Sequence, residues 1–237
     1  MAPAITLQDL RRDFGDRPAL AGVSLDLEAG ETLAVLGPNG SGKTTLLRIL
    51  AGLLRPSGGS ATVLDRPIPD EAWRLRGRIG YLGHDALLYR DLTGRENLRF
   101  HARLHGLEPV RAQERIESLL QLLGMERRAD DRIDTLSAGM RQRIAVCRCA
   151  LHEPDLLLLD EPDSNLDADG RESARAVVGR EAEATRVIVS HDPGRALAEA
   201  DRVLVLAAGG SVEHLGSAAE MLAETRSHLG SDPGDGR

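Results

Sequence analysis

Gly37-Pro38-Asn39-Gly40-Ser41-Gly42-Lys43-Thr44 is the stretch of sequence that decides the fold. It fits the pattern G-x-x-x-x-G-K-[S/T] and lies between a predicted strand, Thr32 to Leu36, and a predicted helix, Thr44 to Leu54. Glycines in such a loop let backbone N–H groups surround phosphate oxygens, and the following helix adds its positive N-terminal end. A plain glycine-rich turn is the alternative, but the strand–loop–helix context favours a nucleotide site.

The residues expected to hold the nucleotide belong to this loop and to the start of the helix: Gly37, Pro38, Asn39, Gly40, Ser41, Gly42, Lys43, Thr44 and Thr45. Lys43 is the only lysine among 30 basic residues. A compact point charge suits the β- and γ-phosphates, so Lys43 is expected to act in binding and in catalysis. The Thr44 hydroxyl is the expected ligand of Mg²⁺.

A pair of carboxylates, Asp160 and Glu161, follows the continuous apolar run Leu156 to Leu159. Such a run predicts a buried strand, and open α/β sheets bind ligands at the C-terminal ends of their strands. We expect Asp160 to hold Mg²⁺ through a water molecule, and Glu161 to orient and polarise the attacking water. A strand that ends in a solvated acidic turn is the alternative, which the phosphate loop disfavours.

The rest of the chain alternates short apolar strands with helices, which predicts an α/β fold with a parallel sheet. Further strands of this kind are expected at Ile79 to Leu82, Val187 to Val189 and Val203 to Leu206. Alternating apolar residues before the phosphate loop predict further strands near the N-terminus: Ile5, Leu7, Val23, Leu25 and Leu27. We expect one domain with a core (1–83 and 155–216), a helical insert (84–154) and a tail (217–237) that forms a helix and frays from Gly230.

The composition is that of a globular protein: 237 residues, of which 41% are hydrophobic and 28% charged. Aromatic residues make up only 2%, so the core must consist of Leu, Val, Ile and Ala. The net charge of −7 argues against a protein that wraps nucleic acid. We expect neither a signal peptide nor a membrane span, because the longest apolar stretches are far below the ~20 residues that a spanning helix needs.

Leu136-Ser137-Ala138-Gly139-Met140 precedes a predicted helix, and Ser137 is a favourable N-cap residue for it. Together with the phosphate loop and the acidic pair, this segment resembles the signature of the ATP-binding subunits of ABC transporters. The resemblance covers nearly the whole chain and implies a P-loop NTPase fold of the ABC ATPase type, with ATP and Mg²⁺ as ligands. This fold has a RecA-like core sheet, an antiparallel strand group near the N-terminus and an inserted helical subdomain. The resemblance also implies that Ser137 and Gly139 contact a nucleotide held by a second copy of the chain, so that the active unit is a dimer with two ATP sites.

Other elements of this family follow in order along the chain. Phe14 matches the position whose ring stacks on adenine, although an ordinary aromatic at a strand end is the alternative. Ser164-Asn165-Leu166-Asp167 matches the loop that passes between the two sites, and His191 matches the histidine that contacts the γ-phosphate. The resemblance therefore implies an ATPase that drives an integral membrane subunit from the cytoplasmic face of the membrane.

The chain departs from the family pattern at three positions. His84 stands where the family usually has a glutamine that touches Mg²⁺, and imidazole nitrogen is a poor match for this hard cation. Ala138 replaces a glycine, and Met140 stands where glutamine is common. Gly83-His84, Leu87-Leu88-Tyr89 and Met140 are similar to the ATPase subunit of cytochrome c maturation haem exporters. Haem export is thus the favoured substrate system, and a multidrug or ABC-2-type exporter is the alternative.

Two other function classes fit the sequence less well. A soluble ABC ATPase that acts on DNA or ribosomes is expected to carry long coiled-coil insertions or two sets of motifs. A regulator without turnover is expected to lack Glu161 or His191, and both are present. His101 and His105 have the spacing of metal ligands but no third ligand in the sequence nearby, so a solvated helix face is expected. Cys147 and Cys149 are expected to pack in the core.

Overall fold

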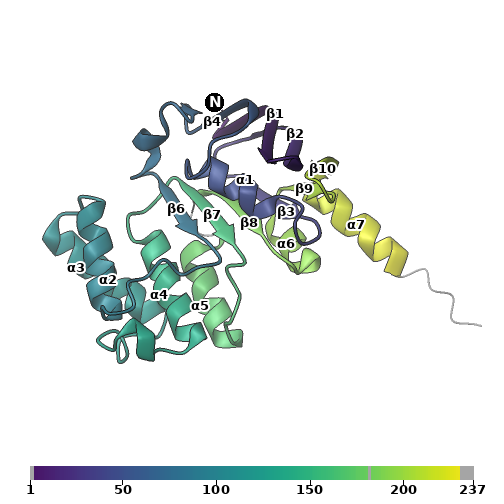
Figure 1. The fold of residues 1–237 in the computed structure, drawn as a ribbon. Coiled ribbons are helices and arrows are strands. Elements are labelled where there is room, and N and C mark those ends of the chain that lie inside the picture. Colours follow the sequence, from purple (N-terminus) through teal and green to yellow (C-terminus); the bar gives the residue numbers. More distant parts are fainter. Residues whose placement is uncertain (1–2, 181–182, 230–237) are drawn as a thin grey trace, which may run out of the picture.

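The computed structural model describes residues 3–180 and 183–229. Its centre is a six-stranded sheet in the order β10-β9-β3-β8-β7-β6 (Figure 1). The strands are β3 (Thr32–Leu36), β6 (Ile79–Leu82), β7 (Leu156–Asp160), β8 (Thr185–Val189), β9 (Arg202–Leu206) and β10 (Val212–Ser217). Neighbours pair in parallel, except that β10 is antiparallel to β9. The predicted parallel α/β sheet is confirmed.

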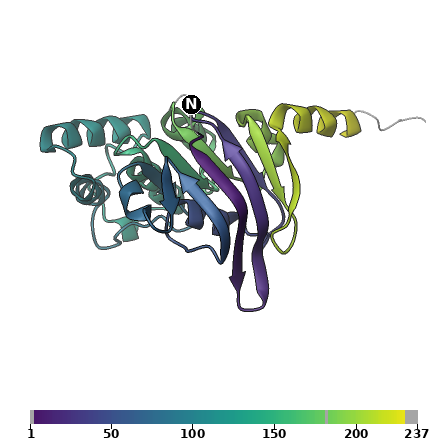
Figure 2. The same ribbon diagram turned by 90° about the horizontal axis from the view of Figure 1, so that it is seen from above.

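A second, four-stranded antiparallel sheet has the order β2-β1-β4-β5. It consists of β1 (Ile5–Phe14), β2 (Arg17–Leu27), β4 (Gly58–Val63) and β5 (Arg66–Ile68). Figure 2 shows the hairpin of β1 and β2 projecting beyond the other strands. The antiparallel group predicted near the N-terminus is therefore present.

Helix α1 (Lys43–Leu50) lies between the two sheets (Figure 1). Its apolar residues join one hydrophobic cluster with side chains from both sheets: Leu46, Leu47, Ile49 and Leu50. The helix was expected to extend to Leu54 but ends at Leu50, because Gly52 adopts a φ of 68° and its N–H bonds to Ile49 O. The helix that follows the phosphate loop is thus fixed by packing on both of its sides.

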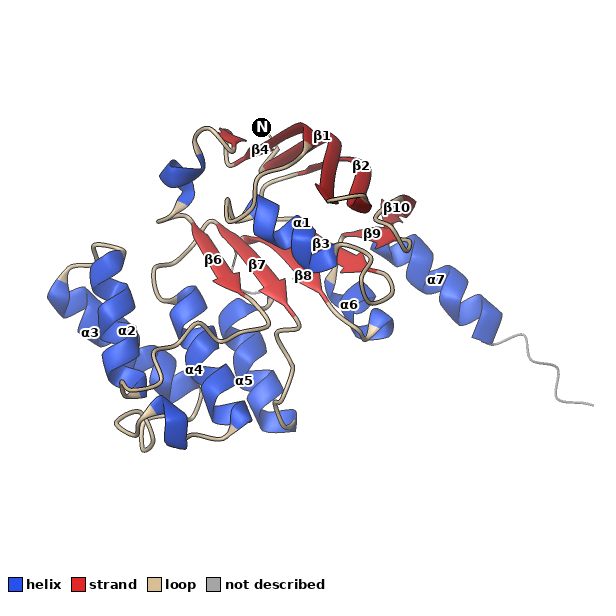
Figure 3. Cartoon of the chain, in the orientation of Figure 1, coloured by secondary structure: helices blue, strands red, loops and turns tan. Residues whose placement is uncertain are grey.

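The other face of the central sheet carries a helical layer (Figure 3). It consists of α2 (Gly94–Leu104), α3 (Pro109–Leu122), α4 (Ala138–Ala150) and α5 (Ala168–Val178), with a short 3₁₀ turn at η2 (Ile133–Thr135). A second 3₁₀ turn, η1 (Ala72–Leu75), lies on the opposite side of the sheet, where it packs with β5 and the first hydrophobic cluster. Residues of α2, α3 and α4 share a hydrophobic cluster with α5 and with β6, β7 and β8. The insert expected at 84–154 is therefore helical and packs as one layer with α5, and the division of the chain at these bounds stays a prediction.

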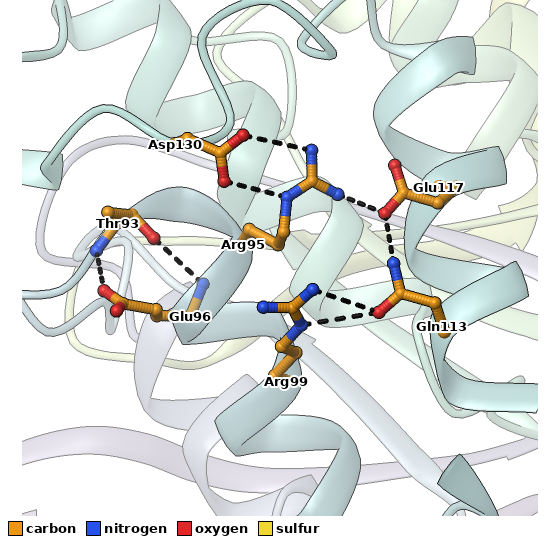
Figure 4. A network of polar contacts seen from close by, with 7 residues as sticks. All are labelled: Thr93, Arg95, Glu96, Arg99, Gln113, Glu117 and Asp130. Carbon is orange, nitrogen blue, oxygen red and sulfur yellow. Dashed lines mark hydrogen bonds and ion pairs between the residues drawn. The ribbon is translucent and has the colours of Figure 1, made fainter. Parts of the chain in front are cut away.

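Polar contacts join α2 to α3 and to the segment before η2 (Figure 4). The Arg95 guanidinium, with an exposed fraction of 14%, donates to Asp130 Oδ1 (2.9 Å) and to Glu117. Thr93 and Glu96 cap the start of α2 by exchanging hydrogen bonds between side chain and backbone. The start of α2 is thus held to the chain that leads into η2.

The last elements are α6 (Pro193–Glu199) and α7 (Ala218–Leu229), which pack on β3 and β9 through a small third cluster. The tail helix was expected from Ser217, but Ser217 is the last residue of β10 and α7 begins one residue later. The fraying expected for 230–237 lies outside the described residues. Within 3–180 and 183–229, no helix has the length and apolar character needed to cross a bilayer.

Two side-chain expectations have different outcomes. Cys147 and Cys149 are fully buried, as expected, and burial raises the pKa of each thiol to about 12.

The expectation that His101 and His105 form a solvated helix face is wrong. Both rings are half-buried, and His105 stacks on His152 with ring centroids 3.8 Å apart. The chain after α4 folds back against α2, a contact that the spacing of histidines in one helix does not reveal.

Candidate functional site

The phosphate loop connects β3, whose residues are all buried, to the start of α1. Gly37, Gly40 and Gly42 have φ values of 142°, 80° and 96°, which L side chains rarely adopt. At Gly42, moreover, a Cβ atom would lie 2.0 Å from Ala19 O. The first turn of α1 has no side-chain cap, so its N–H groups are available to an anion.

Lys43 curls back over this loop. Its Nζ atom donates to Gly37 O (2.8 Å) and to Pro38 O (2.9 Å). Both acceptors are neutral carbonyl oxygens of the loop itself, so neither contact neutralises the charge of the ammonium group. Such an arrangement suits a cation that meets phosphate oxygens as a point charge.

Thr44 and Asp160 bring two oxygen ligands together at the end of the phosphate loop. The Thr44 hydroxyl donates to Asp160 Oδ2 over 2.7 Å, and Asp160, the last residue of β7, is 5% exposed. A hydroxyl and a carboxylate are hard oxygen donors of the kind that Mg²⁺ prefers. Among the described residues, no cluster of three acidic, histidine or cysteine side chains could hold a metal alone. These two residues fit an ion that completes its shell with water and phosphate oxygens.

Glu161 and His191 form a close pair next to this position. His191 Nδ1 lies 2.5 Å from Glu161 Oε2, and the imidazole is 81% exposed while the carboxylate side chain is 23% exposed. Glu161 has a φ of 54°, a backbone conformation that is uncommon for non-glycine residues, and its N–H donates to Val189 O (2.9 Å). The backbone of β8 thus fixes the position of this carboxylate.

One open hollow of about 680 Å³ joins these groups. It is lined by Phe14, Ala19, Asn39, Gly40, Gly42, Lys43, Thr44, Thr45, His84, Asp160, Glu161, Ser164, Val189 and His191. The hollow lies at the carboxyl ends of β3, β7 and β8, where parallel sheets bind ligands. The aromatic ring, most of the phosphate loop, both carboxylates and both histidines expected from the sequence therefore meet at one place.

Ser137 and Gly139 lie elsewhere. Ser137 caps α4, its Oγ accepting from Met140 N (3.2 Å), and both residues line a separate hollow with Arg143, Asn165 and others. A Cβ atom on Gly139 would lie 2.7 Å from Asn165 O, so glycine permits this close approach. The fold does not bring the signature residues to the phosphate loop of their own chain.

Arg143 and Gln142 are functional-site neighbours that the sequence motifs did not indicate. Arg143 donates to Asp167 Oδ1 (2.7 Å), and Gln142 Nε2 donates to Pro162 O (3.1 Å). The backbone N–H of Gly170 and then the Arg143 guanidinium hold the pKa of Asp167 below its usual range. Helix α4 is thus bonded to the loop that follows Glu161. In the sequence, the one signal of this contact is Gln142, a polar residue on the otherwise apolar, buried face of α4.

Asp163 lies in the same loop and has the opposite shift. Burial raises its pKa, and its carboxylate pairs with Arg195 Nε from α6 over 3.2 Å. The loop after β7 is therefore held on one side by α4 and on the other by α6.

The family model described as "ABC transporter" matches residues 20–164. The daunorubicin resistance ATP-binding protein DrrA3 of Streptomyces coeruleorubidus is 38% identical over 226 residues, which are 94% of this chain and 71% of that protein. The Nod factor export ATP-binding protein I of Cupriavidus pinatubonensis is 39% identical over 71% of this chain and 53% of its own length. The sulfate/thiosulfate import ATP-binding protein CysA of Synechococcus elongatus is 39% identical over 93% of this chain and 64% of its own. The chain thus spans between about half and seven-tenths of these relatives.

Solved structures agree with this fold. The ATP-binding subunit of an ABC transporter superimposes with a TM-score of 0.85 at 26% identity, covering 96% of this chain and 93% of that one. A dimeric, post-hydrolysis ATP-binding cassette, MJ0796 bound to ADP and phosphate, gives 0.81 at 26% identity, covering 90% and 98% of the two chains.

Proposed function

We propose that this chain, which belongs to the ABC transporter family of ATP-binding proteins, works as a dimer that hydrolyses MgATP to drive export through a separate membrane subunit. Members of this family are ATPases coupled to transport. The observation that carries the proposal is the single hollow in which the phosphate loop, the Thr44–Asp160 pair and the Glu161–His191 pair meet.

Nucleotide binding would use the two ends of this hollow. The phosphate loop offers its N–H groups and the Lys43 ammonium to the triphosphate, while Phe14, 51% exposed at the other end, offers a ring face to the base. Thr44 and Asp160 would hold Mg²⁺, the latter through water, and the ion when bound would neutralise phosphate charge. His84 lines the hollow as well, but we assign it to coupling with the membrane subunit rather than to metal binding, because nitrogen is a poor ligand for Mg²⁺.

Hydrolysis would depend on Glu161 and His191. Glu161 would accept a hydrogen bond from the attacking water and polarise it, and the imidazole beside it would fix the direction of the carboxylate. His191 is exposed enough to meet the γ-phosphate once a nucleotide is present.

The dimer follows from the place of Ser137 and Gly139. Because they lie away from their own phosphate loop, they would complete a site only on a second copy, where Ser137 and the N-terminal end of α4 offer donors to the γ-phosphate. The MJ0796 cassette is dimeric, which supports this arrangement. The membrane subunit would place the dimer at the cytoplasmic face of the membrane.

Glu161→Gln tests the proposed chemistry. The substitution preserves the shape of the side chain and removes its charge, so ATP affinity should stay within about twofold while hydrolysis falls by about 10²-fold or more. ATP binding is measured by calorimetry and turnover by phosphate release. Glu114→Gln, which removes an exposed carboxylate from α3, should behave as the parent in both assays. Parental turnover in Glu161→Gln would remove Glu161 from the mechanism.

Two export substrates have separate support. Haem export for cytochrome c biogenesis is our first candidate, because of the Gly83-His84 step, Leu87-Leu88-Tyr89 and Met140; none of the relatives named above is described as a haem exporter. A multidrug or ABC-2-type exporter is the second, supported by the 38% identity to a daunorubicin resistance protein. Deleting the gene should abolish c-type cytochromes if the first is correct. Normal cytochrome content together with increased drug sensitivity would select the second.

A further inference from the structure

Phe14 has a charged neighbour on one face of its ring. The guanidinium carbon of Arg12 lies 4.6 Å from the ring centroid. We propose that Arg12 is a positioning residue for the nucleotide base, which holds the Phe14 ring in the orientation needed for stacking. This inference rests on the proposed function, because it assumes that Phe14 receives the base.

The two faces of the ring differ in their surroundings. Arg12 and Phe14 are two residues apart in β1, so their side chains lie on the same face of the strand. Phe14 lines the nucleotide hollow, whereas Arg12 is not among the residues that line it. In this proposal the guanidinium covers the face of the ring turned away from the hollow, and the base stacks on the other face.

Arg12 is itself anchored. Its Nη1 atom donates to Arg55 O (3.1 Å), in the segment that follows α1. Two more hydrogen bonds join β1 to this segment, from Ser57 N to Arg11 O (2.8 Å) and from Asp13 N to Ser57 Oγ (3.1 Å). Because α1 begins at the phosphate loop, these bonds fix the ring relative to the loop that would hold the other end of the nucleotide.

The remaining contacts of Arg12 favour the stacked geometry. Its Nε atom is buried and has no hydrogen-bond partner among the described residues, so the aromatic face is what meets this part of the cation. A cation over an aromatic ring is attracted by the negative face of the ring, which stabilises the stacked pair. A ring that is already held in place loses less conformational freedom when a base stacks on it.

Arg11 provides a matched control. It neighbours Arg12 in the same strand, carries the same charge and forms an exposed ion pair with Asp9 at 2.8 Å. A general attraction of positive charge for the triphosphate would be lost in both Arg11→Gln and Arg12→Gln, although to a smaller extent at Arg11 because Asp9 partly neutralises its charge. A contribution through Phe14 would be lost only in Arg12→Gln.

The test measures dissociation constants by calorimetry for two probes, ATP and inorganic tripolyphosphate, each with Mg²⁺. Arg12→Gln should weaken ATP binding about two- to fivefold and leave tripolyphosphate binding unchanged. Arg11→Gln should change neither. In a Phe14→Ala background, which itself weakens ATP binding, Arg12→Gln should have no further effect. Arg12→Lys, which keeps the charge without the planar group, should fall between the parent and Arg12→Gln.

Several results would overturn the proposal. Equal weakening of both probes would mean that Arg12 supports the phosphate loop and not the ring. Tighter ATP binding by Arg12→Gln would mean that the guanidinium occupies the face that the base needs. An undiminished effect in the Phe14→Ala background would mean that Arg12 acts independently of the ring. A parent protein that binds no ATP would instead reject the proposed function, so the two failures are distinct.

Discussion

Gly42 shows how a single residue joins the two sheets at the candidate site. The carbonyl of Ala19, in β2 of the antiparallel sheet, would lie 2.0 Å from a Cβ atom at this position. The residue also has a φ of 96°, so a side chain there is both strained and in collision with backbone. The end of the phosphate loop is thus fitted against β2 without space for any other amino acid.

Gly42→Ala should therefore damage both stability and binding. We expect the collision to displace the loop or β2, lowering the melting temperature by several degrees and weakening ATP binding at least tenfold. Gly30→Ala is the matched control, since Gly30 has a φ of 84° but no atom within 4 Å of its Cβ position. That variant should show only the cost of its backbone conformation, about 1–2 kcal/mol, with unchanged ATP affinity. Equal ATP affinity in the two variants would contradict the steric explanation.

At this scale the sequence predicts motif residues well and their supporting contacts poorly. The phosphate loop and the Asp160-Glu161 pair have fixed spacing within short segments, and the structure places them in one hollow. Arg143 and its partner Asp167 lie 24 positions apart, so their contact depends on how α4 packs against α5. No local pattern encodes that packing. The roles assigned to the site residues remain predictions.

Among the secondary-structure elements, the end of α2 carries an unusual group of half-buried histidines. His101 Nε2 and His152 Nδ1 are buried without a hydrogen-bond partner among the described residues, and His105 stacks on His152. Burial is the largest cause that lowers the pKa of His101 and His152 to about 4, and repulsion from the Arg148 cation and from any protonated neighbouring ring adds to it. None of the groups that shift these two rings is a carboxylate. The packing of α2 on the end of α4 thus requires neutral imidazoles.

This cluster should make the fold sensitive to acid. Below the ordinary histidine pKa of 6.5, the His101 and His152 rings bind protons in the unfolded chain, whereas in the folded chain they bind them only near pH 4. The free energy of unfolding should therefore fall as the pH is lowered from 6.5 towards 4, by on the order of 1 kcal/mol for each half-buried ring. Urea unfolding at pH 7.5 and at pH 5 measures this loss.

His152→Gln serves as the test variant, because its amide can still donate to Ile79 O as the ring does over 3.0 Å. It should lose less stability than the parent between the two pH values, while His214→Gln, on β10, serves as the control. An identical loss in the parent and in His152→Gln would show that the carboxylates elsewhere cause the acid sensitivity.

For the whole molecule, the separation of the signature residues from the phosphate loop decides how many chains a complete site needs. Ser137 and Lys43 line different hollows of the same chain. If each site uses one half from each copy, a dimer of two differently damaged subunits contains one intact site and one doubly damaged site.

Mixing subunits tests this arrangement. Lys43→Ala and Ser137→Arg should each be inactive alone, whereas their mixture should regain ATPase activity through the one intact site of the heterodimer. The expected recovery is about a quarter of the parental rate: half of the dimers in an equal mixture are heterodimers, and half of their sites are intact. Differently tagged subunits verify that heterodimers form. No recovery in verified heterodimers would mean that Ser137 does not act across the interface.

The architecture was predictable where strands are fully buried and less so at the edges. β3, β7 and β8 each contain a continuous apolar run, which the sequence reveals directly, but β8 starts two residues before its run, at Thr185 and the buried Arg186. β10 was not predicted, since Val212–Ser217 is half exposed and gains its strand conformation from pairing with β9. β5 is only three residues long and contains Pro67, so local propensity argues against it. Both edge strands gain their conformation from hairpin pairing with the strand just before them, β9 and β4 respectively, and not from an apolar pattern of their own.

The position of α1 between the two sheets has a consequence for how the molecule opens. Of the residues Leu46 to Leu50, only Arg48 is exposed, so no partial loosening of one sheet frees this helix. The amide hydrogens of its buried last turn, from Leu47 to Leu50, should exchange with solvent only when the entire domain unfolds. A ligand bound at the first turn of α1 stabilises the folded state and therefore raises the free energy of this global unfolding. It should slow amide exchange in both sheets by the same factor, even far from the atoms that it contacts.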